Sequence, residues 1–283
     1  MTNESPIVAR SVAAMRKEVE EWRRAGDVVG VVPTMGALHD GHLALVQAAK
    51  SECDRVIATI FVNPAQFAAN EDLDAYPRGE AADLAKLQEL QTDMAFMPDA
   101  DEMYPDGFAT KVWVEGITEI LCGLGRPLHF GGVATVVSKL FHQSQADRAY
   151  FGEKDYQQFL VVRRMARDLD IPIDVVPVPT VREADGLAMS SRNVYLSIEQ
   201  RAAAPALYRV IRDVAAQVTN GSSAEAAVAW GLEELATCGF DSIEYLEVLE
   251  AEMLGPIDFP NKPGRVFVAA HLGSTRLIDN VTV

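Results

Sequence analysis

Two short apolar segments with a helix-like segment between them constrain the fold of this chain more than any other feature. The first spans residues 28–32 and stops at Pro33, and the second spans residues 55–62 and reads RVIATIFV. Uninterrupted apolar character of this kind is typical of strands that are buried on both faces of a sheet. Because residues 42–49 have helical spacing, the order is strand, helix, strand, and such a crossover joins parallel strands.

The same alternation continues to about residue 181. Further helices are expected at 11–24, 81–90, 133–143 and 154–169, and further strands at 94–97, 110–114, 148–151 and 173–178. Beyond that point the pattern changes to two Ala-rich helices, at 201–218 and 224–237, and three short strands, at 243–249, 265–270 and 275–279. We therefore expect an α/β protein with a Rossmann-like parallel-sheet domain at 1–181 and a smaller α+β domain at 182–283.

Charge and cysteine content limit the class of partner. The 283 residues carry 25 Lys and Arg against 41 Asp and Glu, a net charge of −16, which disfavours binding to nucleic acid or to anionic membranes. No apolar run approaches the roughly 18 residues that a membrane span needs. Cys53, Cys122 and Cys238 lack the spacing of a zinc site and are interpreted as buried thiols. With no signal peptide at the start of the chain, these features indicate a cytoplasmic protein.

The segment PTMGALHDGH, directly after the first strand, is the strongest candidate for a nucleotide site. Gly36 and Gly41 allow the backbone to approach a ligand closely, and Asp40 is a candidate N-cap for the following helix. His39 and His42 lie three residues apart, so both can share one face where the helix begins. The unpaired N–H groups of a helix start, together with two imidazoles, are suited to phosphate oxygens.

A second candidate segment, FGEKDYQQ, also follows a strand and opens a helix. Gly152 permits a tight turn, and Lys154 offers a point cation to a phosphate. Asp155 can cap the helix or hold Mg²⁺, and Gln158 lies one turn beyond Lys154 on the same face. A solvated cluster of charges is the alternative interpretation.

Two more polar segments are weak signals when each is taken alone. Asn63 and Gln66 follow the second strand and offer neutral amides to hydroxyl or carboxylate groups, although an ordinary Asn-Pro turn is the simpler interpretation. Ser190, Ser191 and Arg192 combine two hydroxyls with a guanidinium that could clamp a triphosphate. A Ser-rich linker between domains is the alternative for that second segment.

Taken together and in order, these segments resemble those of one family. The HxGH spacing of His39 and His42 is similar to that of the nucleotidyltransferase superfamily, which includes class I aminoacyl-tRNA synthetases. The strings PTMGALHDGH, FVNPAQF, DLDAYPR, FGEKDYQQ and READGLAMSSRN resemble the pantoate–β-alanine ligase (pantothenate synthetase) family. The resemblance implies condensation of (R)-pantoate with β-alanine to pantothenate, with ATP and Mg²⁺. A pantoyl adenylate is the implied intermediate, and AMP and pyrophosphate are the implied products.

The resemblance also implies roles for single residues. It places ATP on a set made of Met35, Gly36, Ala37, Leu38, His39, Asp40, Gly41, His42, Gly152, Glu153, Lys154, Asp155, Val181, Met189, Ser190, Ser191 and Arg192. The implied catalytic residues are His42, His39, Lys154 and Arg192. Pantoate falls on Gln66 and Gln158, with β-alanine also near Gln66, and Asn63 contacts the adenylate. Asp83 is expected near the metal, although Ala82 stands where some relatives carry an acid. Relatives form dimers, which implies a homodimer.

Two other functions stay open on the sequence alone. A nucleotidyltransferase that stops at a nucleotidylated product, such as a cytidylyltransferase, fits the histidine pair by itself. A non-catalytic nucleotide sensor on the same fold would bind ATP without releasing pyrophosphate. For the enzyme, the loop at 63–78 is a candidate lid and the C-terminal domain a candidate cover, because an acyl adenylate must be protected from water.

Overall fold

The computed structural model describes residues 5–67, 73 and 76–283, and the chain folds as two compact units. The first unit comprises Met1–Glu153 and Gln157–Pro179. The second unit comprises Lys154–Tyr156 and Thr180–Val283.

The short segment that contains Lys154 groups with the C-terminal unit, which differs from the predicted division at residue 181. Contacts within the unit explain the grouping. The side-chain amide of Asn280 donates to the backbone oxygen of Lys154 at 2.9 Å. The ring of Tyr156 lies 6.1 Å from the ring of Phe267, and the Arg265 guanidinium lies 3.8 Å from the centre of the Tyr156 ring.

The first unit is built on a six-stranded parallel sheet in the order β1-β4-β3-β2-β5-β6. Its strands are β1 (Ile7–Ala9), β2 (Val29–Thr34), β3 (Arg55–Ile60), β4 (Met94–Phe96), β5 (Arg148–Gly152) and β6 (Asp174–Val178). The predicted crossover is confirmed, because β2 and β3 pair in parallel from Val29 and Arg55 to Thr34 and Ile60. The α/β class and the parallel sheet are therefore as the sequence indicates.

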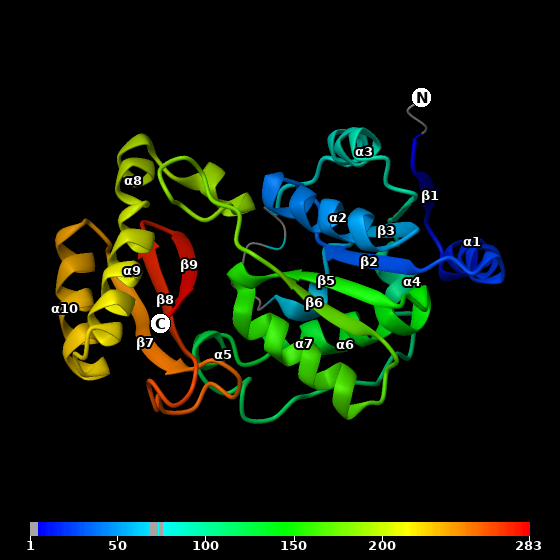
Figure 1. The fold of residues 1–283 in the computed structure, drawn as a ribbon. Helices are drawn as coiled ribbons and strands as arrows, with labels where there is room; N and C mark the ends of the chain where they lie inside the picture. The colour runs from blue at the N-terminus through cyan, green and yellow to red at the C-terminus, as the bar shows by residue number, and fades with distance from the viewer. Residues whose placement is uncertain (1–4, 68–72, 74–75) are drawn as a thin grey trace. The chain divides into compact units, whose positions relative to one another are not determined.

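Helices cover both faces of this sheet, as Figure 1 shows with α2 and α3 on one face and α6 and α7 on the other. The helical elements are α1 (Val12–Ala25), α2 (Asp40–Glu52), η1 (Pro64–Gln66), α3 (Glu80–Glu89), α4 (Ala100–Met103), α5 (Cys122–Gly125), α6 (His129–Ser144), η2 (Glu153–Asp155) and α7 (Tyr156–Asp168). Val32, Val56 and Ala58 are fully buried beneath α2. This double cover accounts for the uninterrupted apolar strands.

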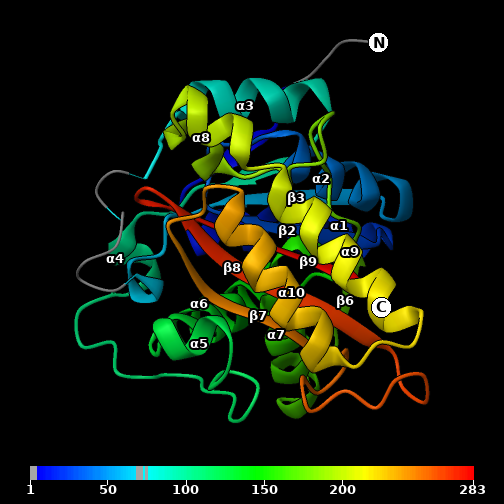
Figure 2. The ribbon, with the colours of Figure 1, turned by 90° about the vertical axis from the view of Figure 1, so that its left-hand side faces the viewer.

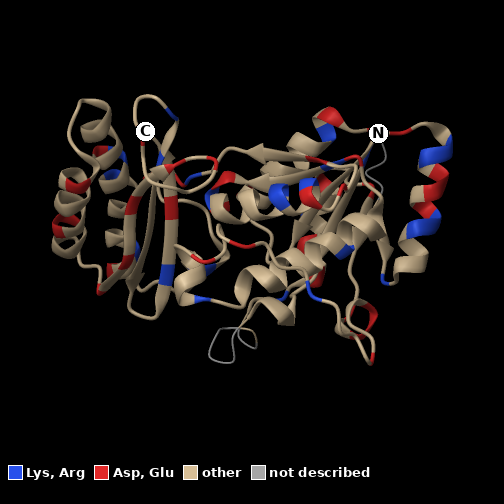
Figure 3. Ribbon diagram, turned by 90° about the horizontal axis from the view of Figure 1, so that it is seen from below, with Lys and Arg blue, Asp and Glu red and all other residues tan. Residues whose placement is uncertain are grey.

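Helix α1 shows how local sequence sets an element's ends. The Ser11 side chain caps its start, and Gly26 ends it with a φ of 87°, a left-handed value that glycine adopts readily. Met15 and Trp22 face the core while Lys, Arg and Glu alternate on the outside. Figure 3 shows both signs of charge along this helix.

The second unit pairs a three-stranded antiparallel sheet with helices, as predicted for a smaller α+β domain. Its elements are η3 (Ser191–Tyr195), α8 (Ile198–Ala203), α9 (Ala206–Thr219), α10 (Ala224–Thr237), β7 (Ser242–Glu250), β8 (Gly264–Leu272) and β9 (Thr275–Thr282). Figure 2 shows α9 and α10 side by side over the sheet. Their buried residues, among them Val210 and Val214, form one core with Val266 and Val268 of β8.

The structure differs from the expected elements at residues 110–114, at β1 and at Pro205. The strand expected at 110–114 is absent, because the Val112 amide donates to the Thr135 hydroxyl rather than to a neighbouring strand. Strand β1 was not predicted, since three residues are too few to show a periodic pattern. The single helix expected at 201–218 is interrupted at Pro205, which has no N–H to continue the first helix.

Cys53 and Cys122 are buried, whereas Cys238 is only partly buried, and none of the three forms a disulfide. Within the described ranges, no helix is both long and apolar enough to span a bilayer.

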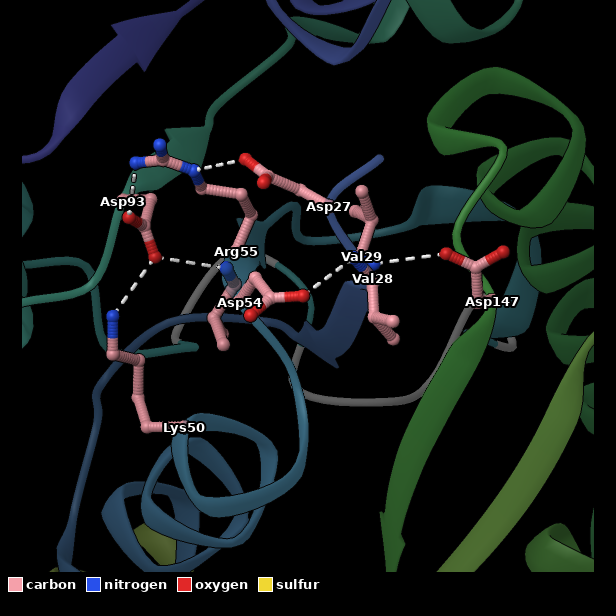
Figure 4. Close-up of polar contacts among 9 residues, drawn as sticks. Asp27, Val28, Val29, Lys50, Asp54, Arg55, Asp93 and Asp147 are labelled. Carbon is pink, nitrogen blue, oxygen red and sulfur yellow. Dashed lines mark hydrogen bonds and ion pairs between the residues drawn. The ribbon is translucent and has the colours of Figure 1, made fainter. Parts of the chain in front are cut away.

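Aspartates close the amino-terminal edge of the parallel sheet (Figure 4). Asp54, directly before β3, accepts the Val28 amide at 2.8 Å. Asp147, directly before β5, accepts the Val29 amide at 2.9 Å. Backbone amides at the start of a strand need hydrogen-bond acceptors, and these carboxylates supply them. A carboxylate also forms a stronger hydrogen bond with a backbone N–H than a neutral acceptor does.

Asp93 makes the densest set of contacts at this edge (Figure 4). Directly before β4, it accepts the Val56 amide at 2.9 Å, the Lys50 ammonium at 3.0 Å and the Arg55 guanidinium at 3.2 Å. Arg55 in turn donates to Asp27 at 2.8 Å. The amino ends of β2, β3 and β4 are thus joined through one network of charges.

We expect Asp93→Ala to lower the free energy of unfolding by about 2–3 kcal/mol, because it takes the carboxylate acceptor from the part-buried Val56 amide and from Lys50, and one of the two carboxylates from Arg55. Chemical denaturation followed by far-UV circular dichroism measures this change. The matched control is Asp168→Ala, which removes an exposed partner of Arg167 and should change stability by less than about 0.5 kcal/mol. Equal effects of the two substitutions would contradict the role given to Asp93.

Candidate active site

The loop after β2 has a backbone conformation that few residues adopt. Gly36 and Ala37 have φ angles of 83° and 49°, in the left-handed region that disfavours a β-carbon. A β-carbon on Gly36 would also lie 3.0 Å from Ile60 and 3.1 Å from a carboxylate oxygen of Asp83. The loop therefore turns sharply at the carboxyl end of β2 and leads into α2.

Asp83 holds this loop by its backbone. Its two carboxylate oxygens accept hydrogen bonds from the amides of Ala37 at 2.9 Å and Leu38 at 2.8 Å, and the residue is only 2% exposed. Lys86, one turn further along α3, donates to the backbone oxygen of Leu38. Because ionised acceptors bind backbone amides more strongly than neutral ones do, α3 fixes the loop in its left-handed turn.

These bonds bear on the expectation that Asp83 lies near a metal ion. A cation at Asp83 would compete with two backbone amides for the same carboxylate. Over the part of the chain that the structure describes, no group of three or more His, Cys, Asp and Glu side chains gathers to hold a metal. The donor set at Asp83 therefore does not fit a resident Mg²⁺ ion, which usually takes several oxygen ligands.

The two histidines meet at the start of α2. His39 is the N-cap, and Asp40, predicted as the cap, is instead the first helical residue. The imidazole rings stack with their centres 4.0 Å apart, and the His39 amide donates to Nδ1 of His42 at 3.3 Å. Since a backbone amide can only donate, Nδ1 of His42 is an acceptor, and the neutral ring carries its proton on Nε2. The pair therefore combines a ring N–H donor with the positive end of a 13-residue helix.

Asn63 and Gln66 lie at the carboxyl end of the neighbouring strand, β3, on the short helix η1. Asn63 is 1% exposed and Gln66 is 9% exposed. The NH₂ group of Asn63 donates to the side-chain oxygen of Gln66 at 3.0 Å, and Nε2 of Gln66 lies 3.0 Å from the sulfur of Met35. The loops after β2 and β3 are thus connected, which brings the predicted pantoate residue Gln66 beside the predicted ATP residue Met35.

Two residues from other parts of the first unit support this pair, and neither of them is among the residues predicted for the site. The Tyr104 hydroxyl donates to the side-chain oxygen of Asn63 at 2.7 Å. His129, at the start of α6, contacts the backbone oxygen of Gln66 through Nδ1 at 3.0 Å. No local pattern marks Tyr104, because the residue it contacts lies 41 positions away.

Gln158 and its neighbour Gln157 open α7. Gln157 is buried and donates to the backbone oxygens of Ile117 and Ile120, both at 2.8 Å. Gln158, the residue predicted to bind pantoate, is partly buried. Of the two adjacent glutamines, Gln157 therefore has a structural role in holding the chain at 117–122.

In the second unit, the READGLAMSSRN segment is a braced hairpin rather than a loose linker. The backbone amide of Met189 donates to the backbone oxygen of Val181 at 3.0 Å, and Gly186 makes the turn with a φ of 95°. Arg182 anchors the base of the hairpin through two bonds to Asp279, at 2.6 and 2.9 Å. Ser190 then caps η3, accepting the Arg192 amide at 3.3 Å.

Glu183 ties this hairpin to the residues that follow it. One carboxylate oxygen accepts the side-chain amide of Asn193 at 2.9 Å, and the other accepts the Arg201 guanidinium at 2.6 Å. Asn193 also donates to the backbone oxygen of Ala188 at 3.1 Å. The short helix that carries Ser191 and Arg192 is consequently fixed on both sides.

The predicted site residues divide between the two units. The first unit holds Met35, Gly36, Ala37, Leu38, His39, Asp40, Gly41, His42, Asn63, Gln66, Asp83, Gly152, Glu153 and Gln158. The second holds Lys154, Asp155, Val181, Met189, Ser190, Ser191 and Arg192. The Lys154 ammonium lies 3.9 Å from the Asp155 carboxylate. The candidate lid at 63–78 falls partly on residues 68–72 and 74–75, which lie outside the described residues.

Comparisons with known proteins agree with these features. The family model described as pantoate-beta-alanine ligase matches residues 7–282. A pantothenate synthetase of Caulobacter vibrioides is 57% identical over 282 residues, which cover 99% of each chain. A pantothenate synthetase of Dinoroseobacter shibae is 55% identical and covers 98% of this chain and 99% of its own.

Solved structures give the same result for the fold. The pantothenate synthetase of Thermus thermophilus superimposes with a TM-score of 0.92 at 49% identity, covering 97% of this chain and 98% of its own. The pantoate-beta-alanine ligase of Francisella tularensis, complexed with beta-gamma ATP and beta-alanine, has a TM-score of 0.83 at 33% identity and covers 98% of each chain. By sequence and by fold, over nearly its whole length, this chain belongs to the pantoate–β-alanine ligase family.

Proposed function

We propose that this chain condenses (R)-pantoate with β-alanine to pantothenate, using ATP and passing through a pantoyl adenylate, with release of AMP and pyrophosphate. Membership of the family supports the reaction, and the Francisella relative was crystallised with an ATP species and β-alanine. The observation that carries the adenylation step is the histidine pair at the start of α2. The Asp83 carboxylate fixes the loop that leads to this pair.

The first half-reaction needs alignment more than it needs a base. A carboxylic acid with a pKa of about 4 is already ionised at neutral pH, so pantoate can attack the α-phosphorus directly. The protein must hold the attacking oxygen in line with the leaving pyrophosphate and stabilise charge on the phosphate oxygens. We assign the second task in the first unit to Nε2–H of His42, to His39 and to the first turn of α2.

The second unit supplies the cations of the proposed reaction. Lys154 and Arg192 are assigned to the phosphates of ATP, with the hydroxyls of Ser190 and Ser191. The braced hairpin supports this role, because a clamp on a highly charged ligand works best when its own backbone is fixed. Gln66 and Gln158 are assigned to pantoate, and β-alanine is placed near Gln66.

Mg²⁺ is proposed to enter with ATP as part of the substrate. A Mg²⁺ ion on a nucleotide takes most of its ligands from phosphates and water and needs few from the protein. The carboxylate of Asp83, which accepts two backbone amides, is accordingly left out of the metal's coordination.

We further propose that the enzyme acts in the cytoplasm on small molecules alone, as a homodimer. Support for these points comes from the resemblance to the family and from the acidic composition.

The reaction itself is tested by incubating the purified chain with ATP, Mg²⁺, pantoate and β-alanine. We expect pyrophosphate release only when pantoate is present, and AMP and pantothenate when β-alanine is added as well. A nucleotidylated product that persists in the presence of amines would favour a nucleotidyltransferase instead. ATP binding without pyrophosphate release would favour the sensor, and either result would overturn the proposal.

We expect His42→Ala to lower the rate of pantoate-dependent pyrophosphate release by about 10²–10³, the usual loss when one well-placed donor to a developing charge is removed. The thermal unfolding temperature should stay unchanged, since the ring lies at a helix start. His142→Ala is the control, because His142 is exposed and its imidazole contacts the Ser138 oxygen, one helical turn away, at 2.7 Å. A variant at His42 with near-normal turnover would remove the assigned role.

Asp83→Asn should separate loop support from metal binding. Asparagine can accept only one of the two amides, so we expect a stability loss of about 1.5–3 kcal/mol and a lower kcat/KM for ATP. At constant MgATP, the dependence of the rate on free Mg²⁺ should match that of the unchanged protein. A clear increase in the free Mg²⁺ needed for half-maximal rate would instead make Asp83 a metal ligand.

A further inference from the structure

The side-chain amides of Asn63 and Gln66 have a defined orientation, and the backbone sets it. The oxygen and nitrogen of a side-chain amide occupy similar positions, so the orientation must come from partners that have only one hydrogen-bonding role. Asn63 has two such partners. The amide of Ala65 can only donate, and it donates to Oδ1 of Asn63 at 3.2 Å. The backbone oxygen of Gly132 can only accept, and it accepts from Nδ2 of Asn63 at 3.2 Å.

The orientation of Asn63 then determines that of Gln66. The atom of Gln66 that meets the NH₂ group of Asn63, at 3.0 Å, has to be the carbonyl oxygen. The NH₂ group of Gln66 is therefore at the other side, where it lies 3.0 Å from the sulfur of Met35. A thioether is a weak acceptor, so this donor gains hydrogen-bond energy when an oxygen replaces the sulfur as its partner.

Tyr104 completes the set of bonds on Asn63. Because Oδ1 of Asn63 can only accept, the Tyr104 hydroxyl must be the donor in their 2.7 Å contact. Burial raises the pKa of Tyr104 to about 12, so this hydroxyl keeps its proton at any pH the enzyme meets. Its ring is held at 6.2 Å from the Phe61 ring and 5.1 Å from the Phe108 ring. Asn63 thus donates two bonds and accepts two, which is the full capacity of its amide.

Close packing of α6 makes this arrangement possible. A β-carbon on Gly132 would lie 2.2 Å from the backbone oxygen of Ala65, so only glycine allows the helix to approach η1 this closely. The same approach places His129 against the backbone oxygen of Gln66. The backbone of Gln66 is therefore fixed by α6, and its side chain is fixed through Asn63, which α6 contacts at Gly132.

We propose that Asn63 and Tyr104 are positioning residues that hold Gln66 with its NH₂ group, and not its carbonyl oxygen, available to a substrate oxygen. In this role Asn63 acts through Gln66 and makes no direct contact with the adenylate, in contrast to the role implied by the family resemblance. A fixed donor selects a carboxylate or hydroxyl oxygen and rejects a group that can only donate. The inference rests on the proposed function for the substrate, which is pantoate.

The orientation is tested first by two substitutions at Gln66. Gln66→Glu replaces the NH₂ group that is available to the substrate with an oxygen. Gln66→Met keeps a side chain of similar length and removes its polar atoms. If the NH₂ group faces the substrate, calorimetry should give a pantoate Kd that rises at least tenfold in Gln66→Met. The Kd should rise further in Gln66→Glu, because a glutamate oxygen then repels the pantoate oxygen. A glutamate variant that binds pantoate as well as the unchanged protein would overturn the orientation.

A double-mutant cycle tests the positioning role of Tyr104. Tyr104→Phe should raise the pantoate Kd about threefold to tenfold when Gln66 is present, and should have no further effect in the Gln66→Met background. Equal weakening in both backgrounds would mean a general structural role and would overturn the proposal. Tyr150→Phe is the matched control, since it removes a buried hydroxyl that contacts Glu52 and Cys53 and should leave pantoate binding unchanged.

A measurement without substrate keeps this inference separate from the proposed function. In the ligand-free protein, NMR should show a nuclear Overhauser effect between the NH₂ protons of Gln66 and the methyl group of Met35. If that effect is present but pantoate does not bind, the proposed function fails and the orientation stands. If Gln66 NH₂ protons instead contact Asn63, the orientation fails whatever the substrate is.

Discussion

The parallel direction of β2 and β3 gives the sheet two chemically different edges, and the rest of the first unit follows from that difference. At the amino edge, strand amides without a ladder partner require acceptors, and Asp54, Asp93 and Asp147 provide them (Figure 4). At the carboxyl edge, the segments that follow β2 and β3, which include the starts of α2 and η1, carry His39, His42, Asn63 and Gln66. Aspartate therefore stabilises the closed edge, while the opposite edge presents hydrogen-bond donors.

The loop after β2, which leads to the histidine pair at that edge, has a backbone conformation that is energetically unfavourable for a residue with a β-carbon. Left-handed Ala37 has an unfavourable backbone energy of about 1–2 kcal/mol and would relax if nothing opposed it. The carboxylate of Asp83 opposes it through two bonds to consecutive amides, and each bond to a charged group is worth about 1.5–3 kcal/mol. The bonds outweigh the strain, so the loop is fixed before any ligand arrives.

Local sequence was enough for the parts of this architecture that depend on neighbouring residues. The apolar runs at 28–32 and 55–62 predicted β2, β3 and their parallel pairing, and Gly26 predicted the end of α1. Local sequence did not predict the contacts between segments that are far apart in the chain. The partners of Asp83 lie 45 and 46 positions away, and Tyr104 meets Asn63 across 41 positions. The hydrogen bond from Val112 to Thr135, which replaces a predicted strand, is of the same kind. Such pairings depend on the tertiary fold, and no periodicity in the sequence encodes them.

Neutral hydrogen-bond donors suit the proposed nucleophile, the pantoate carboxylate, better than cations do. If pantoate attacks through its carboxylate, charge leaves that carboxylate as the bond to phosphorus forms. A lysine or arginine paired tightly to it would stabilise the ground state more than the transition state and would slow the step. An amide such as Gln66 orients the oxygen with a weaker hold, whereas the phosphates gain charge and benefit from full cations. In the proposed reaction Gln66 therefore orients the nucleophile, while His42 in the first unit and Lys154 and Arg192 in the second stabilise charge on the phosphates.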